Sequence, residues 1–391
     1  MFVAKFKDGT KISLVDDWHL EELRELRKKR PFFCPVCEES VQLKLGTTRL
    51  WHFAHEPQAA CSERGESESM YHMKGKKLLY EWLQSQQVKV ALECYLPIIK
   101  QRPDLLFRFK NTLYAVEYQC SPIEITLLEK RTQGYKQIGV VPIWILGGNR
   151  LKRYGPHTFS LKSYEWLCTQ LSKNHFFHLT YFCSEQKSFA QLHQLTPYSS
   201  TKFLASYQES SLMNTSISSI VQPPLVRKGN MFGKWITVRK NWRYKNLSPY
   251  PSKIERIIRE ILYKNGVPPS LFPVEAGWPT AYHYLISTSP YHWQLLILFE
   301  CLQHQPLNQP FSRQLVIQCL FPYIENRWLM LRNISEPWTQ AIDGFLHFLT
   351  RVGYLDKMES KQGMFMRVRN PVIPTNVEEA LALDEAIKLR S

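Results

Sequence analysis

Two carboxylates and an amide lie close together in the stretch QRPDLLFRFKNTLYAVEYQCS, residues 101–121. Two apolar runs around a polar turn at residues 110–111 predict a β-hairpin. Opposed residues in this hairpin have residue numbers with a constant sum of 221, which pairs Asp104 with Glu117 on one face. Gln119 follows two residues later on the same face. Such hard oxygen ligands favour Mg²⁺ or Mn²⁺. Ordinary carboxylates on an exposed strand edge are the alternative interpretation.

The segment before this hairpin adds further polar groups. Residues 66–87 predict a helix, and Glu68, His72 and Lys76 follow one another at intervals of four. This spacing places all three side chains on one helix face, which could be turned toward the hairpin or form a solvated polar stripe.

A cluster of cysteine and histidine residues precedes the helix. Cys34 and Cys37 are separated by two residues, and so are His52 and His55, fourteen residues further on. Thiolates combined with imidazoles favour Zn²⁺ in a closed tetrahedral site. We therefore expect a structural zinc site, with Cys61 as a fifth candidate, so that the fourth ligand is either His55 or Cys61. Two unrelated pairs in a small hairpin are the alternative.

The segments that carry these residues alternate between helical and strand patterns. The expected order is α-β-β-β-α-β, with a helix at 66–87, strands at 88–97, 103–109 and 112–120, a helix at 121–137 and a strand at 140–147. Ser121, Pro122 and Glu124 predict that the second helix begins with a capping box.

The carboxylate hairpin in this element order resembles the core of the PD-(D/E)XK nuclease superfamily. Four segments, CPVC…WHFAH, ESESMYHMKGKKLL, RPD…VEYQCSPIE and KRTQGYKQIGVVPIWIL, more narrowly resemble the competence protein CoiA family. The resemblance implies a DNA-processing role in natural transformation, with Asp104 and Glu117 as metal ligands. It also places Gln119 where the superfamily usually has a catalytic lysine. A glutamine carries no positive charge, and Lys76 or Lys74 is the candidate to replace that charge.

Basic and aromatic residues suggest contacts with DNA. Arg131 and Tyr135, four residues apart on the helix after the hairpin, are expected to contact phosphate or to form a surface pair. Residues 227–266 contain 11 Lys or Arg and two acidic residues. The expected contacts in this stretch are Trp235, Arg239, Lys240, Trp242, Arg243 and Lys245. Cations neutralise phosphates and aromatic rings stack on unpaired bases, which favours single-stranded or branched DNA. In the alternative, the aromatic residues pack against their own domain.

Composition bounds the class of protein. The chain has 391 residues, 44% of them hydrophobic, and a formal net charge of +16, which predicts a polyanionic partner. No apolar run is long enough to span a membrane, and the nine cysteines are not spaced as in a small secreted domain. We therefore expect a cytoplasmic protein with reduced thiols.

The domain organisation follows from changes in pattern along the chain. We expect an α+β protein with a zinc-finger-like module, a nuclease-like αβββαβ core, a linker, and a basic, mainly helical C-terminal domain, at 1–62, 63–183, 184–226 and 227–391. The C-terminal pattern at 340–370, a helix followed by two short strands, outlines a winged helix.

Three functional hypotheses follow. The first is a metal-dependent deoxyribonuclease that acts on incoming or recombining DNA. The second is a catalytically degenerate recombination mediator that binds single-stranded DNA, with a recombinase or other competence proteins as partners. The third is a zinc-stabilised scaffold for protein interactions.

Overall fold

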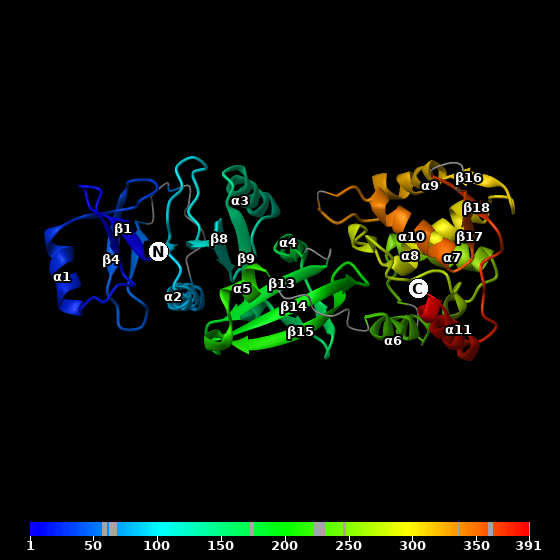
Figure 1. Cartoon of the computed structure of the whole chain (residues 1–391), viewed down its shortest axis with the longest axis horizontal. Helices are drawn as coiled ribbons and strands as arrows, with labels where there is room; N and C mark the ends of the chain where they lie inside the picture. The colour runs from blue at the N-terminus through cyan, green and yellow to red at the C-terminus, as the bar shows by residue number, and fades with distance from the viewer. Residues whose placement is uncertain are drawn as a thin grey trace. The chain divides into compact units, whose positions relative to one another are not determined.

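The computed structural model describes residues 1–56, 61, 69–172, 176–222, 231–244, 248–334, 336–358 and 363–390. Within these ranges the chain is mixed α+β and forms two compact units, each built from separate stretches of sequence (Figure 1). The first unit comprises Met1–Lys152, Tyr164–His193 and Tyr207–Leu225, and the second comprises Arg153–Ser163, Gln194–Ser206 and Val226–Ser391.

The first unit begins with an antiparallel sheet in the strand order β2-β1-β3-β4-β5. Its elements are β1 (Val3–Lys5), β2 (Lys11–Ser13), α1 (Leu20–Lys29), β3 (Phe32–Phe33), β4 (Ser40–Lys44) and β5 (His52–His55). Gly9 lies in the turn between β1 and β2 with φ of +85°, a left-handed conformation that glycine adopts without strain.

A second, larger sheet has the strand order β10-β11-β15-β14-β13-β9-β8-β7-β6, with β12 paired to β13. The predicted α-β-β-β-α-β order is confirmed by α2 (Met70–Ser85), β6 (Val90–Leu92), β7 (Leu105–Phe109), β8 (Thr112–Gln119), α3 (Ile125–Gln137) and β9 (Val141–Gly147). The following elements are β10 (Lys152–Arg153), β11 (Thr158–Ser160), α4 (Ser163–Leu167), β12 (Gln170–Leu171), β13 (Phe177–Cys183), β14 (Ser188–Pro197), β15 (Lys202–Ser211) and α5 (Ile217–Val221).

The register of the β7–β8 hairpin is the predicted one. Leu105 pairs with Val116, so opposed residue numbers add up to 221, and Asp104, one residue before β7, lies opposite Glu117. Lys110 forms the turn with φ of +53°. Strand β8 also pairs in parallel with β9, so Glu117 lies on a strand that has neighbours on both sides. This position explains why the Glu117 side chain is buried.

The hydrophobic core of the first unit is continuous. Phe2 and Phe53 from the small sheet, Leu79 and Trp82 from α2, and Phe107 from β7 belong to one cluster of buried side chains. The small sheet, which the sequence suggested as a separate domain, therefore shares its core with α2 and the hairpin.

Two expected segment boundaries are wrong. Helix α3 begins at Ile125 instead of Ser121, with Glu124 as its N-cap residue. The backbone oxygen of Ser121 accepts a hydrogen bond from the Gln119 side chain. The segment 184–226 is not a linker, because it contains β14, β15 and α5. Polar residues of β14 such as Gln191, His193 and Gln194 are buried in the sheet together with the apolar ones, so the polar composition of this segment does not mark a linker.

The C-terminal part of the second unit is mainly helical. Its elements are α6 (Met231–Tyr244), α7 (Lys253–Lys264), α8 (Pro290–Leu296), the π-helical turn η5 (Ile297–Leu302), β16 (Pro310–Ser312), α9 (Arg313–Glu325), α10 (Thr339–Arg351), β17 (Leu355–Lys357), β18 (Met364–Arg367) and α11 (Val377–Arg390), with shorter 3₁₀ turns at Pro269–Leu271 and His283–Leu285.

From α8 onward this region has the element order of a winged helix, and its three strands are arranged as β16-β18-β17. Helix α10 occupies the place of the recognition helix, but most of its residues are buried. A Cβ at Gly344 would lie 2.1 Å from the backbone oxygen of Ala281, so the chain itself covers this face of α10.

The expectation of reduced thiols is wrong for one pair of cysteines. Cys301 and Cys319 form a disulfide, with their Cα atoms 6.1 Å apart. Both cysteines belong to the helical region, Cys301 in η5 and Cys319 in α9. Among the described residues, no helix is both long enough and apolar enough to cross a membrane.

Candidate functional site

Asp104 lies where helix α2 faces the β7–β8 hairpin. Its carboxylate accepts a hydrogen bond of 2.9 Å from the backbone N–H of Tyr118. Its other neighbours are the Nε2 of His72 at 3.4 Å and the Nζ of Lys76 at 3.3 Å. Burial on its own would raise the pKa of Asp104, but Lys76, His72 and the Tyr118 amide together hold it well below its ordinary value. Asp104 is therefore ionised.

Lys76 is the positive charge at the centre of this group. Its side chain is only 1% exposed, and its Nζ lies 2.6 Å from the Oε1 of Glu93 as well as near Asp104. The other oxygen of Glu93 accepts hydrogen bonds from the backbone N–H groups of Phe2 and Val3, at 2.8 and 3.0 Å. The first strand of the small sheet thus fixes Glu93, and Glu93 fixes Lys76.

Sequence reasoning missed Glu93. A single acidic residue directly after the apolar strand β6 gave a weak signal, because its partners Phe2 and Val3 lie about ninety positions away in the chain. The spacing of His72 and Lys76 on α2 was the better guide. Both side chains reach Asp104, so the interpretation as a solvated stripe does not hold for them.

Glu117 has a separate set of partners. The Nη2 of Arg131 lies 2.5 Å from its carboxylate, and the Tyr135 hydroxyl donates a hydrogen bond to the same oxygen. Burial raises the pKa of Glu117, and the nearby charge of Asp104 adds to this effect, which Arg131 and Tyr135 only partly offset. The two carboxylates of the hairpin therefore have pKa values shifted in opposite directions.

The partners of Glu117 correct the predicted phosphate contacts. Arg131 also donates a hydrogen bond of 3.0 Å to the backbone oxygen of Arg102, and Tyr135 is completely buried. Both side chains are directed toward Glu117 at the hairpin, so they do not form a surface pair, and the buried Tyr135 is out of reach of a phosphate.

Gln119 and Glu68 do not join this group of contacts. The side-chain amide of Gln119 donates a hydrogen bond of 2.8 Å to the backbone oxygen of Ser121. The lysine nearest to Asp104 is therefore Lys76 from α2, and not a residue of β8. Glu68 lies outside the described residues.

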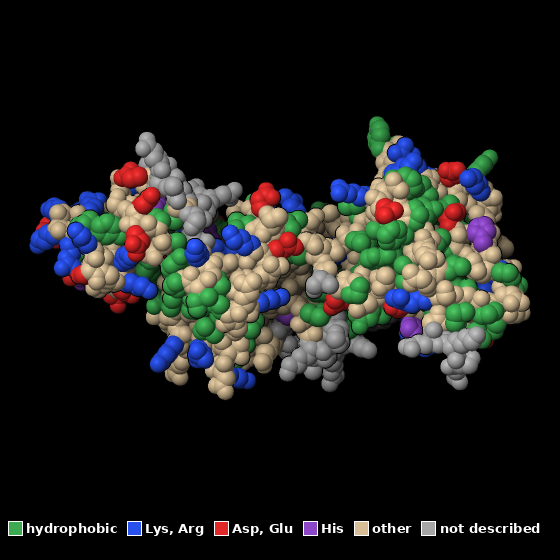
Figure 2. All heavy atoms as spheres, turned by 90° about the horizontal axis from the view of Figure 1, so that it is seen from above, with side chains coloured by type: hydrophobic (Ala, Val, Ile, Leu, Met, Phe, Trp, Pro, Cys, Tyr) green, Lys and Arg blue, Asp and Glu red, His purple; other side chains and the backbone are tan. Residues whose placement is uncertain are grey.

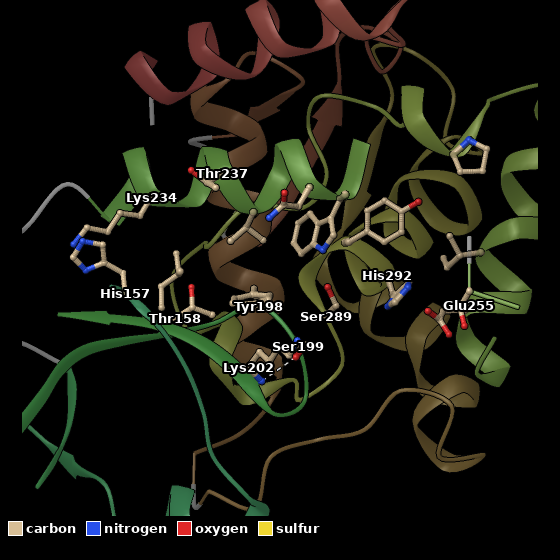
Figure 3. A pocket seen from close by; sticks show the side chains of 18 of the residues that line it. His157, Thr158, Tyr198, Ser199, Lys202, Lys234, Thr237, Glu255, Ser289 and His292 are labelled. Carbon is tan, nitrogen blue, oxygen red and sulfur yellow. Dashed lines mark hydrogen bonds between the residues drawn. The ribbon is translucent and has the colours of Figure 1, made fainter. Parts of the chain in front are cut away.

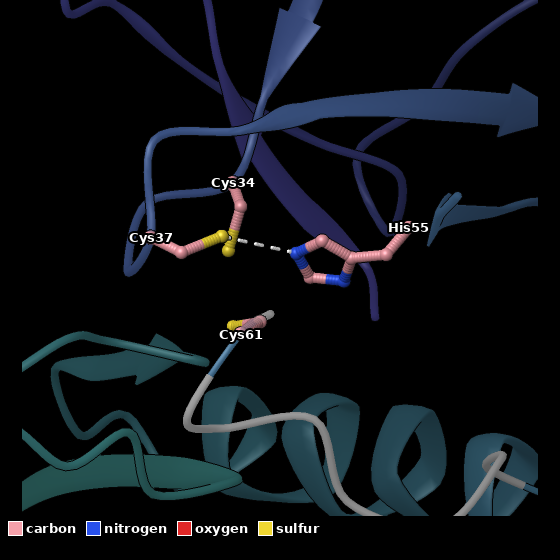
Figure 4. A group of neighbouring side chains, drawn as sticks. All are labelled: Cys34, Cys37, His55 and Cys61. Atoms are coloured by element: carbon pink, nitrogen blue, oxygen red, sulfur yellow. Dashed lines mark hydrogen bonds between the residues drawn. The ribbon is translucent and has the colours of Figure 1, made fainter. Parts of the chain in front are cut away.

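The cysteine and histidine cluster forms a compact group of metal ligands. The donor atoms of Cys34, Cys37, His55 and Cys61 all lie within 4.8 Å of one another, and Figure 4 shows the four side chains converging. The Cys37 sulfur lies 3.3 Å from the Nε2 of His55. Three thiols and one imidazole, placed within reach of a single ion, fit a metal site with four protein ligands.

His52 does not belong to this cluster. Its Nδ1 lies 2.9 Å from the backbone oxygen of Leu50. His52 and His55 are three residues apart on strand β5, and side chains at an odd separation on a strand point to opposite faces. The structure therefore includes both His55 and Cys61, which the sequence offered as alternatives, and leaves His52 out.

Most of the predicted DNA contacts in 227–266 are also turned inward. Trp235 and Arg239 are completely buried, and Arg243 is 2% exposed. Both arginines bind the buried carboxylate of Asp384 on α11, at 2.6 and 2.8 Å. They form part of the interior of the second unit, and DNA cannot reach them. The residues left from this prediction are Lys240, which is exposed, Trp242, which is half-buried, and Lys245, which lies outside the described residues.

Exposed basic side chains are also found in the first unit. Figure 2 shows Lys and Arg side chains gathered over the small N-terminal sheet, where α1 carries Arg24, Arg27, Lys28 and Lys29. Three acidic residues of α1 lie on the same helix, and Glu21 and Glu25 form ion pairs with neighbouring basic residues. On the face shown, blue and red side chains are interspersed over much of the surface.

The chain is similar to known proteins over most of its length. Three family models match: the N-terminal domain of competence protein CoiA at residues 15–64, its nuclease-like domain at 68–225 and its C-terminal domain at 232–381. Competence protein CoiA of Bacillus subtilis (strain 168) is 30% identical over 349 residues, which cover 85% of this chain and 89% of that protein.

The chain belongs to the competence protein CoiA family. The comparison with solved structures gave no significant match. The hairpin with Asp104 and Glu117 lies inside the residues matched by the CoiA nuclease-like domain. All four residues of the cysteine and histidine cluster lie inside those matched by the CoiA N-terminal domain.

Proposed function

We propose that the chain is a metal-dependent deoxyribonuclease of genetic competence, whose site is formed by Asp104, Glu117 and Lys76. The relatives are competence proteins with a nuclease-like domain, which makes DNA the expected substrate. The distance of 3.3 Å between Lys76 Nζ and Asp104 carries the proposal. At this distance Lys76 supplies from α2 the positive charge that Gln119 on β8 lacks.

In this proposal the two carboxylates would hold Mg²⁺ or Mn²⁺, and the ion would activate water and stabilise charge on the phosphate. Lys76 stabilises negative charge beside Asp104, and Glu93 keeps the ammonium in place. His72 is 15% exposed at the edge of the group. Glu117 would exchange Arg131 for the metal ion as its counter-charge.

The test is a cleavage assay on single-stranded, duplex and branched DNA with Mg²⁺ or Mn²⁺. We expect Asp104→Asn and Glu117→Gln to abolish cutting, because each removes a charged ligand while it keeps the side-chain shape. Asp356→Asn, an exposed carboxylate on β17, is the control that should cut at the wild-type rate. Equal cutting by all four proteins would contradict the proposal.

One observation favours a second function. Glu117 already has a counter-charge in Arg131, at 2.5 Å, and a hydrogen bond from Tyr135. A carboxylate paired in this way fits a site that keeps the nuclease fold without cleavage. The chain would then bind DNA and promote its recombination, together with other recombination proteins. In that case none of the DNA substrates is cut, and Asp104→Asn leaves DNA binding unchanged.

We further propose that the Cys34 cluster binds Zn²⁺ and has a structural role. All of its ligands come from the protein, which leaves no open position for a substrate. The small sheet holds Glu93 through Phe2 and Val3, so a metal that stabilises this sheet also supports the position of Lys76.

A further inference from the structure

The second unit contains a cavity of about 980 Å³, which is lined by no residue of the Asp104 hairpin or of the Cys34 cluster. Its walls come from β11, from the turn between β14 and β15 and the start of β15, and from α6, α7 and α8. Figure 3 shows Lys234 and His157 at one end of the cavity, and Glu255 and His292 at the other. This volume lies at the upper end of the range of small-molecule sites, about 300–1,000 Å³.

Aromatic rings form part of the cavity wall. Trp242 of α6, Tyr291 of α8 and Tyr198, which follows β14, all line it and are only half-buried. The rings of Trp242 and Tyr291 lie with their centroids 5.7 Å apart. Trp242 is held from behind by Trp235, at 5.9 Å between centroids. A half-exposed indole on a rigid support offers a surface on which a flat ring can stack.

Two lysines give the cavity a positive charge. Lys202 on β15 and Lys234 on α6 both line it, and within the described part of the chain neither has a carboxylate within 4.0 Å. Glu255, the acidic residue of the lining, is engaged at the N-terminus of α7, where it accepts a hydrogen bond from the backbone N–H of Ser252. The Lys202 ammonium also lies over the ring of Tyr154, 5.2 Å from its centroid, a contact that leaves its positive charge uncompensated by an acid. Both ammonium groups can therefore attract an anion.

Polar groups complete the lining. Asn241 and Thr237 on α6 are exposed and line the cavity, and so does Ser199 beside Lys202. Amide and hydroxyl groups can both donate and accept hydrogen bonds, as the edge of a nucleic-acid base requires. Aromatic faces, unpaired cations and such groups together match one kind of ligand, a base that carries a phosphate.

We propose that this cavity binds an unpaired nucleotide of single-stranded DNA, with the base against Trp242 and the phosphates near Lys202 and Lys234. The site shares no residue with the Asp104 hairpin. It therefore does not depend on cleavage, and it can be tested in a chain that cuts DNA or in one that does not.

The first test measures the affinity of the full chain for a fluorescent single-stranded oligothymidylate by anisotropy, at several salt concentrations. We expect Lys202→Ala combined with Lys234→Ala to weaken binding about tenfold. We also expect the slope of log K against log salt to become shallower by about 1.4, since each lost phosphate contact on a single strand contributes about 0.7. Lys264→Ala is the matched control, because Lys264 is an exposed lysine of α7, a helix that lines the cavity through other residues.

The second test addresses the aromatic wall. Trp242→Leu should weaken binding about 5- to 150-fold, the range for loss of one stacked base, while Trp242→Phe should retain most of the affinity. An oligonucleotide with 5-bromouracil should crosslink on irradiation to a peptide that contains Trp242 or Tyr198. Melting temperatures of all variants show whether the fold is kept, and the lysine variants provide the answer if Trp242→Leu does not fold.

Competition with a free nucleotide distinguishes a site for single-stranded DNA from a site for free nucleotides. If thymidine monophosphate displaces the oligonucleotide at similar concentrations, the cavity is a site for free nucleotides and the single-strand proposal is wrong. It is also wrong if the wild type does not bind the oligonucleotide. Wild-type affinity and salt dependence in the double lysine variant, with crosslinks elsewhere, would likewise overturn it.

Discussion

At the scale of single residues, the position of Lys76 decides how the candidate site works. A buried ammonium is stable only with partners, and those of Lys76 include Glu93 at 2.6 Å and Asp104 at 3.3 Å. The sequence predicted that this face of α2 carries Lys76, and it named the lysine as a substitute for the charge missing at Gln119. It could not predict Glu93, because the backbone amides that hold Glu93 come from the first residues of the chain.

We expect Lys76→Met to lower the free energy of unfolding of the first unit by about 3–5 kcal/mol, because it leaves a buried carboxylate without its cation. Lys77→Met on the same helix is the control and should change it by less than about 0.5 kcal/mol, since Lys77 forms only an exposed pair with Glu81. Urea unfolding measures both. Lys76→Met combined with Glu93→Gln should cost less than the sum of the single changes, and additive costs would contradict the pairing.

The zinc proposal gives a second prediction for single residues. Cys34→Ser, His55→Asn and Cys61→Ser should each lose the bound metal, while His52→Asn should retain it, because His52 lies outside the cluster. Elemental analysis of the purified proteins measures the metal per chain. Loss of metal in His52→Asn with retention in Cys61→Ser would show that the cluster is wrongly assigned.

At the scale of elements, rules of local geometry worked where both partners lie on one hairpin. The position of the turn fixed the constant sum of 221, and with it the pairing of Asp104 and Glu117. The same rules explain one failure. His52 and His55 resemble a chelating pair in sequence, but they lie on a strand, where side chains three residues apart diverge. Such rules cannot predict contacts between residues far apart in the sequence. No residue near Arg239 and Arg243 indicates that both form ion pairs with Asp384 on the last helix.

The buried carboxylate of Asp384 connects helix α11 to α6, because it binds both Arg239 and Arg243. Asp384→Asn should destabilise the second unit by about 3–5 kcal/mol, because it removes the carboxylate charge that two buried guanidinium groups share. Asp343→Asn is the matched control, since its ion pair with Arg313 is about one-third exposed and should contribute less than about 1 kcal/mol. Thermal unfolding compares the two variants, and equal effects would contradict the role of Asp384.

Strands β13 and β14 pair two buried histidines, His178 and His193. Burial lowers the pKa of both side chains, that of His178 to about 4. The folded chain then binds fewer protons than the unfolded chain, so stability is complete above about pH 6.5 and falls as the pH drops toward 4, by at most about 1.4 kcal/mol per pH unit for each residue.

Melting temperatures between pH 7 and pH 4 test this dependence. The double variant His178→Gln and His193→Gln should flatten the decline in melting temperature, whereas His347→Gln, at an exposed position on α10, should not. An unchanged decline in the double variant would show that other groups cause it.

At the scale of the whole molecule, charge and composition were the weakest guides. The net charge of +16 predicted a polyanionic partner, but not which basic residues face it. Arg131, Arg239 and Arg243 are all used inside the protein. By our proposals, the chain has a nuclease-like site in its first unit and a cavity for an unpaired nucleotide in its second unit.

We propose above that the ammonium of Lys76 provides the positive charge that a lysine at position 119 would otherwise provide. The most direct measurement is the single-turnover cleavage rate of single-stranded DNA with Mn²⁺, for the wild type, Lys76→Met and Gln119→Ala, at a temperature where all three are folded. We expect Lys76→Met to slow cleavage at least about 100-fold, because a preorganised charge is lost, and Gln119→Ala to stay within about twofold of the wild type. Cleavage that depends on Gln119 but not on Lys76, or no cleavage by the wild type, would contradict this proposal.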